Sequence, residues 1–275
     1  MIDRGLEDRI LKSLSWEGDL ASLDSLQYAL KGGARTLQIS LDTAICFDSN
    51  VFLRIAGGQN AAELIDYLDN KHTGPLLLPS QVILEFWNNQ GTFIDEYGTR
   101  ILSKFDELYK LVGEIGEEYS EFRDGAKKLV SDFKENFGHV FLSQTRPSLL
   151  IFFEVLQRKS IISQVRRESF SALAASRQAT KTPPGFLDEG DGDFYVWVEF
   201  LLGLLIAKKQ KKTFNEALLV TNDVKRDWST KGIPHPILTA ELFQLVGVPF
   251  RVMDLDEFGK AVKTLIRNDP HNAVI

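Results

Sequence analysis

Four short apolar runs, separated by helical segments, place the strongest constraint on the fold of this chain. They are residues 43–48, 76–78, 217–221 and 249–253. The segments between and after them carry apolar residues at every third or fourth position, which is the pattern of an amphipathic helix. Strands that alternate with helices form a mainly parallel sheet with helices packed on it. The sequence therefore predicts an α/β fold.

A long helical region interrupts this alternation. From Phe93 to Phe137 the apolar residues keep steps of three or four, which predicts one helix of about twelve turns. Residues 148–177 repeat the pattern, so we expect a long antiparallel helical hairpin. The predicted domains are a helical extension over residues 1–35, a discontinuous α/β domain over 36–92 and 181–275, and a hairpin insertion over 93–180.

The bulk composition narrows the class of protein. The 275 residues carry a net charge of 32 − 38 = −6, which excludes a basic coat over the whole chain but not a local basic groove. The single cysteine, Cys46, excludes an internal disulfide and fits a reducing compartment. No apolar run reaches the length of a membrane span, and the N-terminus lacks the apolar core of a signal peptide. We therefore expect a cytoplasmic protein that does not enter a membrane.

Four carboxylates lie where predicted elements begin or end. Asp48 and Asp223 follow two of the apolar runs, Glu85 interrupts the apolar face of a helix, and Asp193 begins another helix. Because ligands gather at the carboxyl ends of parallel strands, we expect Asp48 and Asp223 to share one rim of the sheet. Each acid alone is also typical of a turn, a cap or a solvated helix face. Their combination is what indicates a site.

Clustered carboxylates raise one another's pKa unless a cation compensates them. The four acids are not accompanied by a matching set of histidines or cysteines, and oxygen ligands favour Mg²⁺ or Mn²⁺ over zinc. Such ions can activate a water and stabilise the leaving oxygen of a phosphodiester. Asp48, Glu85, Asp193 and Asp223 are therefore predicted to be both metal ligands and catalytic residues.

Four motifs contain the four acids. They are Phe47-Asp48-Ser49-Asn50-Val51-Phe52-Leu53, Pro79-Ser80-Gln81-Val82-Ile83-Leu84-Glu85-Phe86, Gly192-Asp193-Phe194-Tyr195-Val196-Trp197 and the run from Val220 to Asp227-Trp228. These motifs resemble those of PIN-domain nucleases, and most closely those of a bacterial PIN-like subfamily with a long helical insertion. Two features are typical of that subfamily, a Pro-Pro-Gly-aromatic stretch before the Gly-Asp motif, here Pro183-Pro184-Gly185-Phe186-Leu187-Asp188, and a final Asp-Trp pair. The sequence departs from it at Asn88-Asn89-Gln90, where an Asn-Arg pair is common, so a basic residue expected near the site is missing.

The resemblance implies a three-layer α/β/α fold and metal-dependent cleavage of RNA, less often of DNA. The acids that match the metal ligands of the family are Asp48, Glu85, Asp193 and Asp223. Further candidate ligands are Asp188, Asp191 and Asp227. The neighbouring Asn50, Thr221, Asn222 and Lys225 are predicted to contact the substrate. The expected partners are RNA or single-stranded DNA, together with a second copy of the chain or a regulatory protein bound through the hairpin.

Two other functions compete with that of a nuclease. Phosphatases of the haloacid-dehalogenase type also place an Asp at a strand end, but they need a second Asp two residues later, where this chain has Asn50. The alternative is a catalytically silent PIN-like module that binds RNA or a protein through the hairpin, and the complete acidic set argues against it. The cations Arg166 and Arg167 either line a groove or, as is more usual, belong to a solvated helix face.

Overall fold

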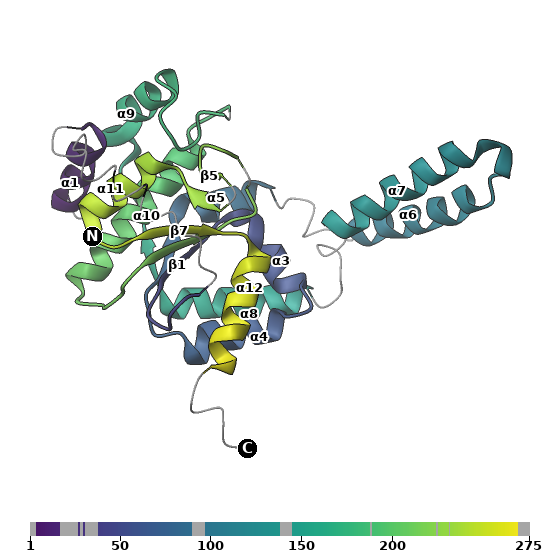
Figure 1. Ribbon diagram of the computed structural model, residues 1–275, viewed down its shortest axis with the longest axis horizontal. Helices are drawn as coiled ribbons and strands as arrows, with labels where there is room; N and C mark the ends of the chain where they lie inside the picture. Colours follow the sequence, from purple (N-terminus) through teal and green to yellow (C-terminus); the bar gives the residue numbers. More distant parts are fainter. Residues whose placement is uncertain are drawn as a thin grey trace, which may run out of the picture.

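The computed structural model describes residues 4–16, 27, 30, 38–89, 97–137, 145–187, 189–223, 225–230 and 232–268. A five-stranded sheet forms its centre (Figure 1), and every neighbouring pair of strands is parallel. The strands lie in the order β3 (Ser160–Ser163), β2 (Leu76–Pro79), β1 (Ala44–Phe47), β4 (Ala217–Val220) and β7 (Phe250–Met253). Every residue of β1, β2 and β4 is buried, which explains why these strands read as unbroken apolar runs.

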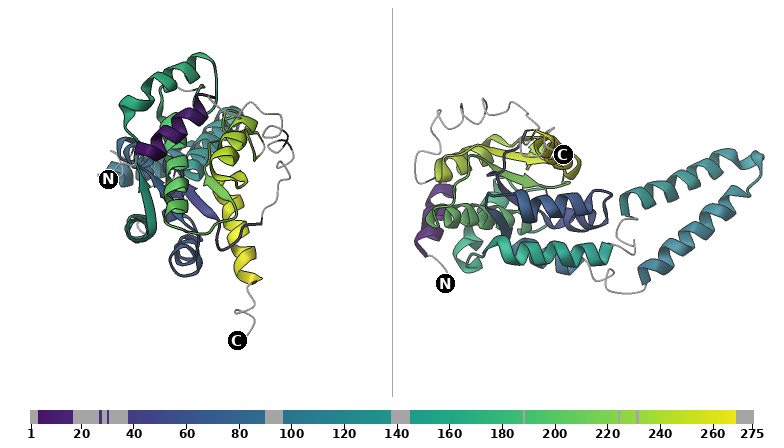
Figure 2. Two further views of the ribbon diagram at one scale, coloured as in Figure 1. Left: turned by 90° about the vertical axis from the view of Figure 1, so that its left-hand side faces the viewer. Right: turned by 90° about the horizontal axis from the view of Figure 1, so that it is seen from below.

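Helices cover both faces of the sheet, which confirms the three-layer α/β/α fold. One layer contains α10 (Gly192–Lys209) and α11 (Pro236–Val246), with α1 (Arg4–Leu14) packed outside them. The other contains α3 (Phe52–Gly57), α4 (Ala61–Asp66), α8 (Thr145–Lys159) and α12 (Leu255–Arg267) (Figures 1 and 2). Within the predicted extension, α1 is helical as expected and buries Ile10 and Leu14 in the same core.

Shorter elements complete the domain. The 3-10 turn η2 (Ser49–Val51) leads into α3, the π-helical turn η3 (Tyr67–Lys71) extends α4, and α5 (Ser80–Asn89) follows β2 directly. The strands β5 (Ser229–Thr230) and β6 (Ile233–Pro234) form a separate antiparallel pair. None of the helices in the described ranges is long and apolar enough to cross a membrane.

The single helix predicted from Phe93 to Phe137 is wrong. This stretch contains two antiparallel helices, α6 (Tyr97–Gly113) and α7 (Ser120–Phe137), which project away from the sheet as an arm (Figures 1 and 2). Glycines at 113 and 116 flank the break, and the 3-10 turn η4 (Glu117–Tyr119) begins the return. The rings of Phe105 and Phe133 stack at 4.3 Å across the seam. The apolar stripe of each helix is therefore covered by the other helix of the arm.

The helix predicted over residues 148–177 is also wrong, because β3 interrupts it. β3 pairs in parallel with β2, and Leu77 lies opposite Ile161. It is followed by α9 (Arg167–Ala179). Consequently α8, β3 and α9 belong to the sheet domain, and the projecting part ends with α7 rather than at residue 180. A four-residue strand with two apolar residues is too short to show an alternating pattern, which is why the sequence concealed it.

Candidate active site at the carboxyl edge of the sheet

Asp48 lies at the carboxyl end of β1, where its side chain is held by neutral donors. Its Oδ1 accepts from the backbone amide of Ser49 at 2.6 Å, and its Oδ2 accepts from Asn50 Nδ2 and Thr221 Oγ1, each at 2.7 Å. Burial raises the pKa of Asp48, the hydrogen bonds from Thr221 and Ser49 oppose that rise, and the charge of Asp223 adds to it. The donors fix the direction of this carboxylate, but they bring no positive charge to it.

Glu85 approaches Asp48 from α5. The hydroxyl of Ser49 lies 3.4 Å from an oxygen of each carboxylate, so one side chain bridges the two acids. Gln81, one turn earlier on α5, donates to Glu85 Oε1 at 2.8 Å. Burial raises the pKa of Glu85 and the charge of Asp48 raises it further. These two acids thus form a close pair whose joint ionisation is unfavourable without a cation.

Asp223 lies on the same rim, after β4. Its backbone amide donates to Thr221 Oγ1 at 3.0 Å, and the same hydroxyl donates to Asp48. Lys225 pairs with the Asp223 carboxylate at 3.0 Å through its ammonium and also donates its backbone amide to it. The expectation that Asp48 and Asp223 share one rim is therefore met, since Thr221 joins them.

Asp193 enters from the first turn of α10, where its Oδ2 accepts from the indole of Trp228 at 3.0 Å. The preceding residue, Gly192, lies directly against Glu85, since a Cβ atom there would come within 2.6 Å of Glu85 Oε1. Gly185 has a positive φ of 83°, and a Cβ on it would lie 2.8 Å from the Cβ of Asp193. Both glycines are needed for α10 to begin beside the acids.

The further candidate ligands occupy different places. Asp191 is half exposed, and its carboxylate lies 3.9 Å from the guanidinium of Arg167. Asp227 is fully buried and accepts from the backbone amide of Gly185 at 3.0 Å, so it holds the loop before α10 rather than facing the rim. Asp188 lies outside the residues that the structure describes.

The four predicted substrate contacts are largely engaged with the acids. Asn50 donates to Asp48 and to Thr221, and its Oδ1 accepts from the backbone amide of Asn222 at 3.1 Å. The side chain of Asn222 in turn accepts from the amide of Leu255 at 3.1 Å. These side chains position the carboxylates, and Asn222 extends the network toward α12.

Arg167 supplies the positive charge that the departure at Asn88-Asn89-Gln90 seemed to remove. From the start of α9 its guanidinium donates to Gln81 Oε1 and lies 4.1 Å from the ring centre of Tyr195. Its charge lowers the pKa of Glu85, against the stronger effect of burial. The sequence offered Arg167 only as one of several groove or surface cations. Its place beside the acids depends on β3, which brings α9 back to the sheet.

The donor set can be tested against a divalent metal. Within the described residues, no group of three or more His, Cys, Asp or Glu side chains lies close enough to hold an ion. Asp48 and Glu85 nevertheless form a pair of oxygen donors. The side chains that donate hydrogen bonds to them carry hydroxyl or amide groups and belong to Ser49, Asn50, Thr221 and Gln81. Mg²⁺ binds through one or two carboxylates and keeps several waters. The pair fits such an ion, and Asp193 and Asp223 flank it.

A parallel sheet between two helical layers, with acids gathered at its carboxyl edge, defines a nuclease-type α/β fold. A family model described as a PIN-like domain matches residues 44–235. The chain therefore belongs to the PIN-like domain family, which confirms the resemblance at the level of the family. Membership of the bacterial subfamily with a long helical insertion stays a prediction. No curated protein and no solved structure was found to match the chain.

Proposed function

We propose that this protein is a metal-dependent nuclease that hydrolyses phosphodiester bonds in RNA, or else in single-stranded DNA. The observation that carries the proposal is the bridged pair of Asp48 and Glu85, which lies beside Asp223 at the carboxyl edge of a PIN-like sheet. Burial raises the pKa of both bridged acids, and a cation would favour their ionised forms.

Each side chain of the site has a definable part in this reaction. Asp48 and Glu85 would hold Mg²⁺ or Mn²⁺, with Asp193 and Asp223 at its flanks. When bound, such an ion acidifies a water and stabilises the charge on the leaving oxygen. Asn50 and Thr221 orient Asp48, and Gln81 orients Glu85.

The half-exposed guanidinium of Arg167 is placed to bind a phosphate oxygen of the substrate beside these acids. It would thereby keep the phosphodiester next to the carboxylate pair.

The test is cleavage of a mixed RNA and of single-stranded DNA in the presence of Mn²⁺. Asp48→Asn and Glu85→Gln are expected to reduce the rate by about 10²-fold or more, because metal stabilisation of the transition state is worth several kcal/mol. Glu121→Gln, which removes an exposed acid from α7, is the matched control and should cleave as the wild type does. Equal rates for the wild type and Asp48→Asn would point to a contaminating nuclease and refute the proposal.

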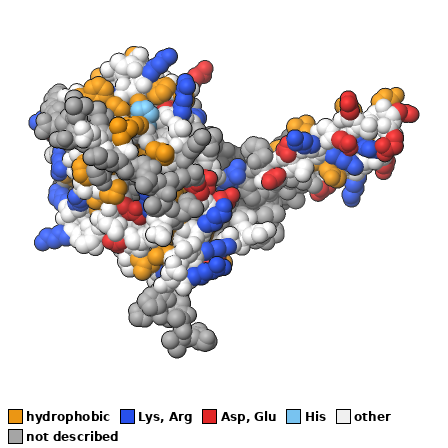
Figure 3. Space-filling model, in the orientation of Figure 1, with side chains coloured by type: hydrophobic (Ala, Val, Ile, Leu, Met, Phe, Trp, Pro, Cys, Tyr) orange, Lys and Arg blue, Asp and Glu red, His pale blue; other side chains and the backbone are white. Residues whose placement is uncertain are grey.

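The exposed apolar side chains of the arm support a second role for it, as the surface that binds a second copy of the chain or a regulatory protein. Leu111, Phe122 and Leu129 are 61%, 69% and 70% exposed there, and hydrophobic side chains lie among charges on its surface (Figure 3). Light scattering of the wild type and of Phe122→Ser with Leu129→Ser tests self-association. RNA binding without cleavage by the wild type would instead support a catalytically silent module.

The buried Cys46 is consistent with the proposed cytoplasmic location.

A further inference from the structure

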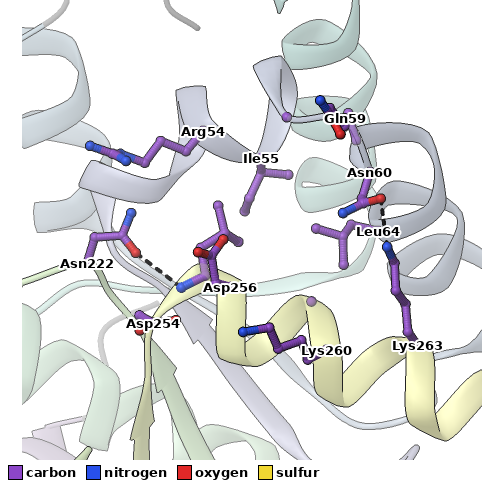
Figure 4. A pocket seen from close by; sticks show the side chains of 14 residues that line it. Arg54, Ile55, Gln59, Asn60, Leu64, Asn222, Asp254, Asp256, Lys260 and Lys263 are labelled. Atoms are coloured by element: carbon purple, nitrogen blue, oxygen red, sulfur yellow. Dashed lines mark hydrogen bonds between the residues drawn. The ribbon is translucent and has the colours of Figure 1, made fainter. Parts of the chain in front are cut away.

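A cleft of about 750 Å³ lies beside the candidate active site, between α3, α4 and α12 (Figure 4). Asn222 belongs to both, since its side chain lines the cleft and its backbone amide donates to Asn50 at 3.1 Å. Asn50 in turn donates to Asp48. A ligand in the cleft would therefore lie next to the acids, and the volume falls in the range of about 300–1,000 Å³ that is usual for ligand pockets.

The lining combines the three kinds of group that a nucleotide needs. Leu255, which is half buried, offers an apolar surface for a base, whereas Ile55 and Leu64 contribute only the 1% and 6% of their surface that stays exposed. Three amide side chains provide hydrogen-bonding groups at its edge. The amides belong to Gln59, Asn60 and Asn222.

The charges of the lining favour an anion. Arg54, Lys260 and Lys263 face two carboxylates, Asp254 and Asp256. Asp254 already caps α12, because its Oδ1 accepts from the amide of Glu257 at 2.7 Å. Basic side chains also gather over α12 on the surface (Figure 3). Lys263 is already engaged, since it donates to Asn60 Oδ1 at 2.8 Å and lies 3.8 Å from a carboxylate oxygen of Glu63. Arg54 and Lys260 are therefore the cations that a phosphate group in the cleft would meet.

The space at Gly259 is open. A Cβ atom built on this residue of α12 would meet nothing within 4 Å, although the residue itself is buried. By contrast, a Cβ on Gly58, on the opposite wall, would come within 2.8 Å of the Arg54 carbonyl oxygen. The cleft therefore has room for a ligand along α12, and the Cβ atom of a side chain introduced at position 259 would enter that room without a close contact.

We propose that this cleft binds one nucleotide of the substrate strand, with its base against Leu255 and its phosphate near Lys260. The neighbouring phosphodiester would then lie at Asp48. The identity of the strand rests on the proposed nuclease function, whereas the binding of a nucleotide does not.

The experiment measures binding of a fluorescein-labelled, single-stranded RNA of twelve nucleotides by anisotropy. EDTA is present, so that binding is read without metal-dependent cleavage. Gly259→Leu narrows the cleft, and it should raise the Kd about tenfold because the base loses its apolar contact and its place beside the amide side chains. Lys260→Ala should weaken binding and reduce the slope of log K against log salt by about 0.7, as expected for one lost phosphate contact.

Matched variants separate the cleft from general charge and folding effects. Lys212→Ala removes an exposed lysine between α10 and β4, at the opposite edge of the sheet, and should leave the Kd within about twofold and the salt slope unchanged. Gly259→Ala adds only a methyl group at a helical position, where alanine is favoured over glycine. Its Kd should lie between those of the wild type and Gly259→Leu.

The outcomes distinguish the two proposals. An unchanged Kd in Gly259→Leu, with a thermal midpoint like that of the wild type, refutes the cleft, and cleavage by the wild type in Mn²⁺ would still support the nuclease. Weakened binding in Gly259→Leu without any cleavage by the wild type supports the cleft and refutes the nuclease. Adenosine 5′-monophosphate should displace the RNA only far above the Kd of the RNA. Displacement at equal concentration would assign the cleft to a free nucleotide and overturn its place on the strand.

Discussion

The sheet domain and the projecting arm use the same residue types in opposite ways. In the sheet domain Glu241 is fully buried and accepts from Arg177 at 2.7 Å and from the indole of Trp197 at 2.8 Å. In the arm Arg123 pairs with Glu117 at the same 2.7 Å, but the glutamate is almost fully solvated. The distance alone therefore does not show which of the two ion pairs contributes more to stability. Burial determines the difference, because a buried charge that loses its partner cannot regain water.

Apolar side chains show the same contrast. In the sheet domain Phe47 packs edge-to-face on Phe152 and Phe258, so this residue of β1 contacts both α8 and α12. In the arm, one seam with Phe105 and Phe133 covers the inner faces, and Phe122 points to solvent. The sheet domain is thus a three-dimensional core, whereas the arm is a two-helix layer whose remaining apolar side chains are available to a partner.

Arg177→Ala should have the largest effect on stability. It leaves the Glu241 carboxylate buried without its cation, which costs about 3–5 kcal/mol and lowers the thermal midpoint by roughly 10 °C. Arg123→Ala in the arm removes the equivalent partner from a solvated pair and should not change the midpoint measurably. Calorimetry on the two variants checks the difference. A similar loss in both would show that burial does not separate the two regions.

Acid should destabilise the sheet domain through His72. Burial, assisted by the charge of Lys159, lowers the pKa of this histidine to about 4. Between about pH 6.5 and pH 4 the unfolded chain therefore binds a proton that the folded chain does not, so stability falls as the pH falls, by up to about 3 kcal/mol. His72→Gln should flatten this part of the curve of unfolding free energy against pH.

The arm provides the internal control for that prediction, because residues 97–137 contain no histidine. Hydrogen exchange of amides in α6 and α7, followed over the same pH range after correction for the intrinsic rate, should not report the transition. A curve for His72→Gln that matches the wild type would assign the acid sensitivity to other groups.

The fold was predictable wherever local pattern and tertiary environment agree. The fully buried strands β1, β2 and β4 read as apolar runs, and α12 follows its periodic stripe from 255 to 267. The prediction of a single helix in the arm is wrong because the apolar residues of α6 and α7 recur with the same period. The apolar stripe therefore continues in the sequence across the turn between Gly113 and Gly116. The strand β3 was not predicted because its formation depends on pairing with β2, and a pattern of four residues in the sequence does not indicate such a pairing.

The candidate site was predictable for a related reason. Asp48 and Asp223 follow parallel strands, and the carboxyl ends of such strands meet at one edge. The bridge through Ser49 and the orientation by Asn50 depend on side-chain directions that only the folded chain defines. The sequence likewise does not show that hydrogen bonds from Thr221 and the Ser49 amide stabilise the ionised form of Asp48.

Arg167→Ala should reduce kcat/KM for RNA cleavage by about tenfold, an effect typical of one charge-assisted phosphate contact. The change should appear mainly in KM, and Arg167→Lys should recover part of it. Because the guanidinium also lowers the pKa of Glu85, the acid limb of the rate profile should move to higher pH in the alanine variant. Arg123→Ala in the arm is the charge-matched control. An unchanged KM with an altered pH profile would restrict Arg167 to orienting the Gln81–Glu85 pair.

Removal of the arm should have the smallest effect on the site. Replacing residues 97–137 with a short Gly-Ser linker deletes α6 and α7 but keeps α8, β3 and α9, whereas a deletion extending to residue 178 would remove the edge strand β3 from the sheet. The seam of the arm is internal to it, and the arm projects away from the sheet (Figure 1). The rate of cleavage of a short RNA should therefore stay within about twofold of the wild type, since surface changes away from a site rarely exceed about 0.5 kcal/mol. Self-association or binding of a regulatory protein should be lost in the same variant. A large fall in the rate for the short RNA would instead make the arm part of the catalytic unit, and the contrast between the two regions would then not extend to function.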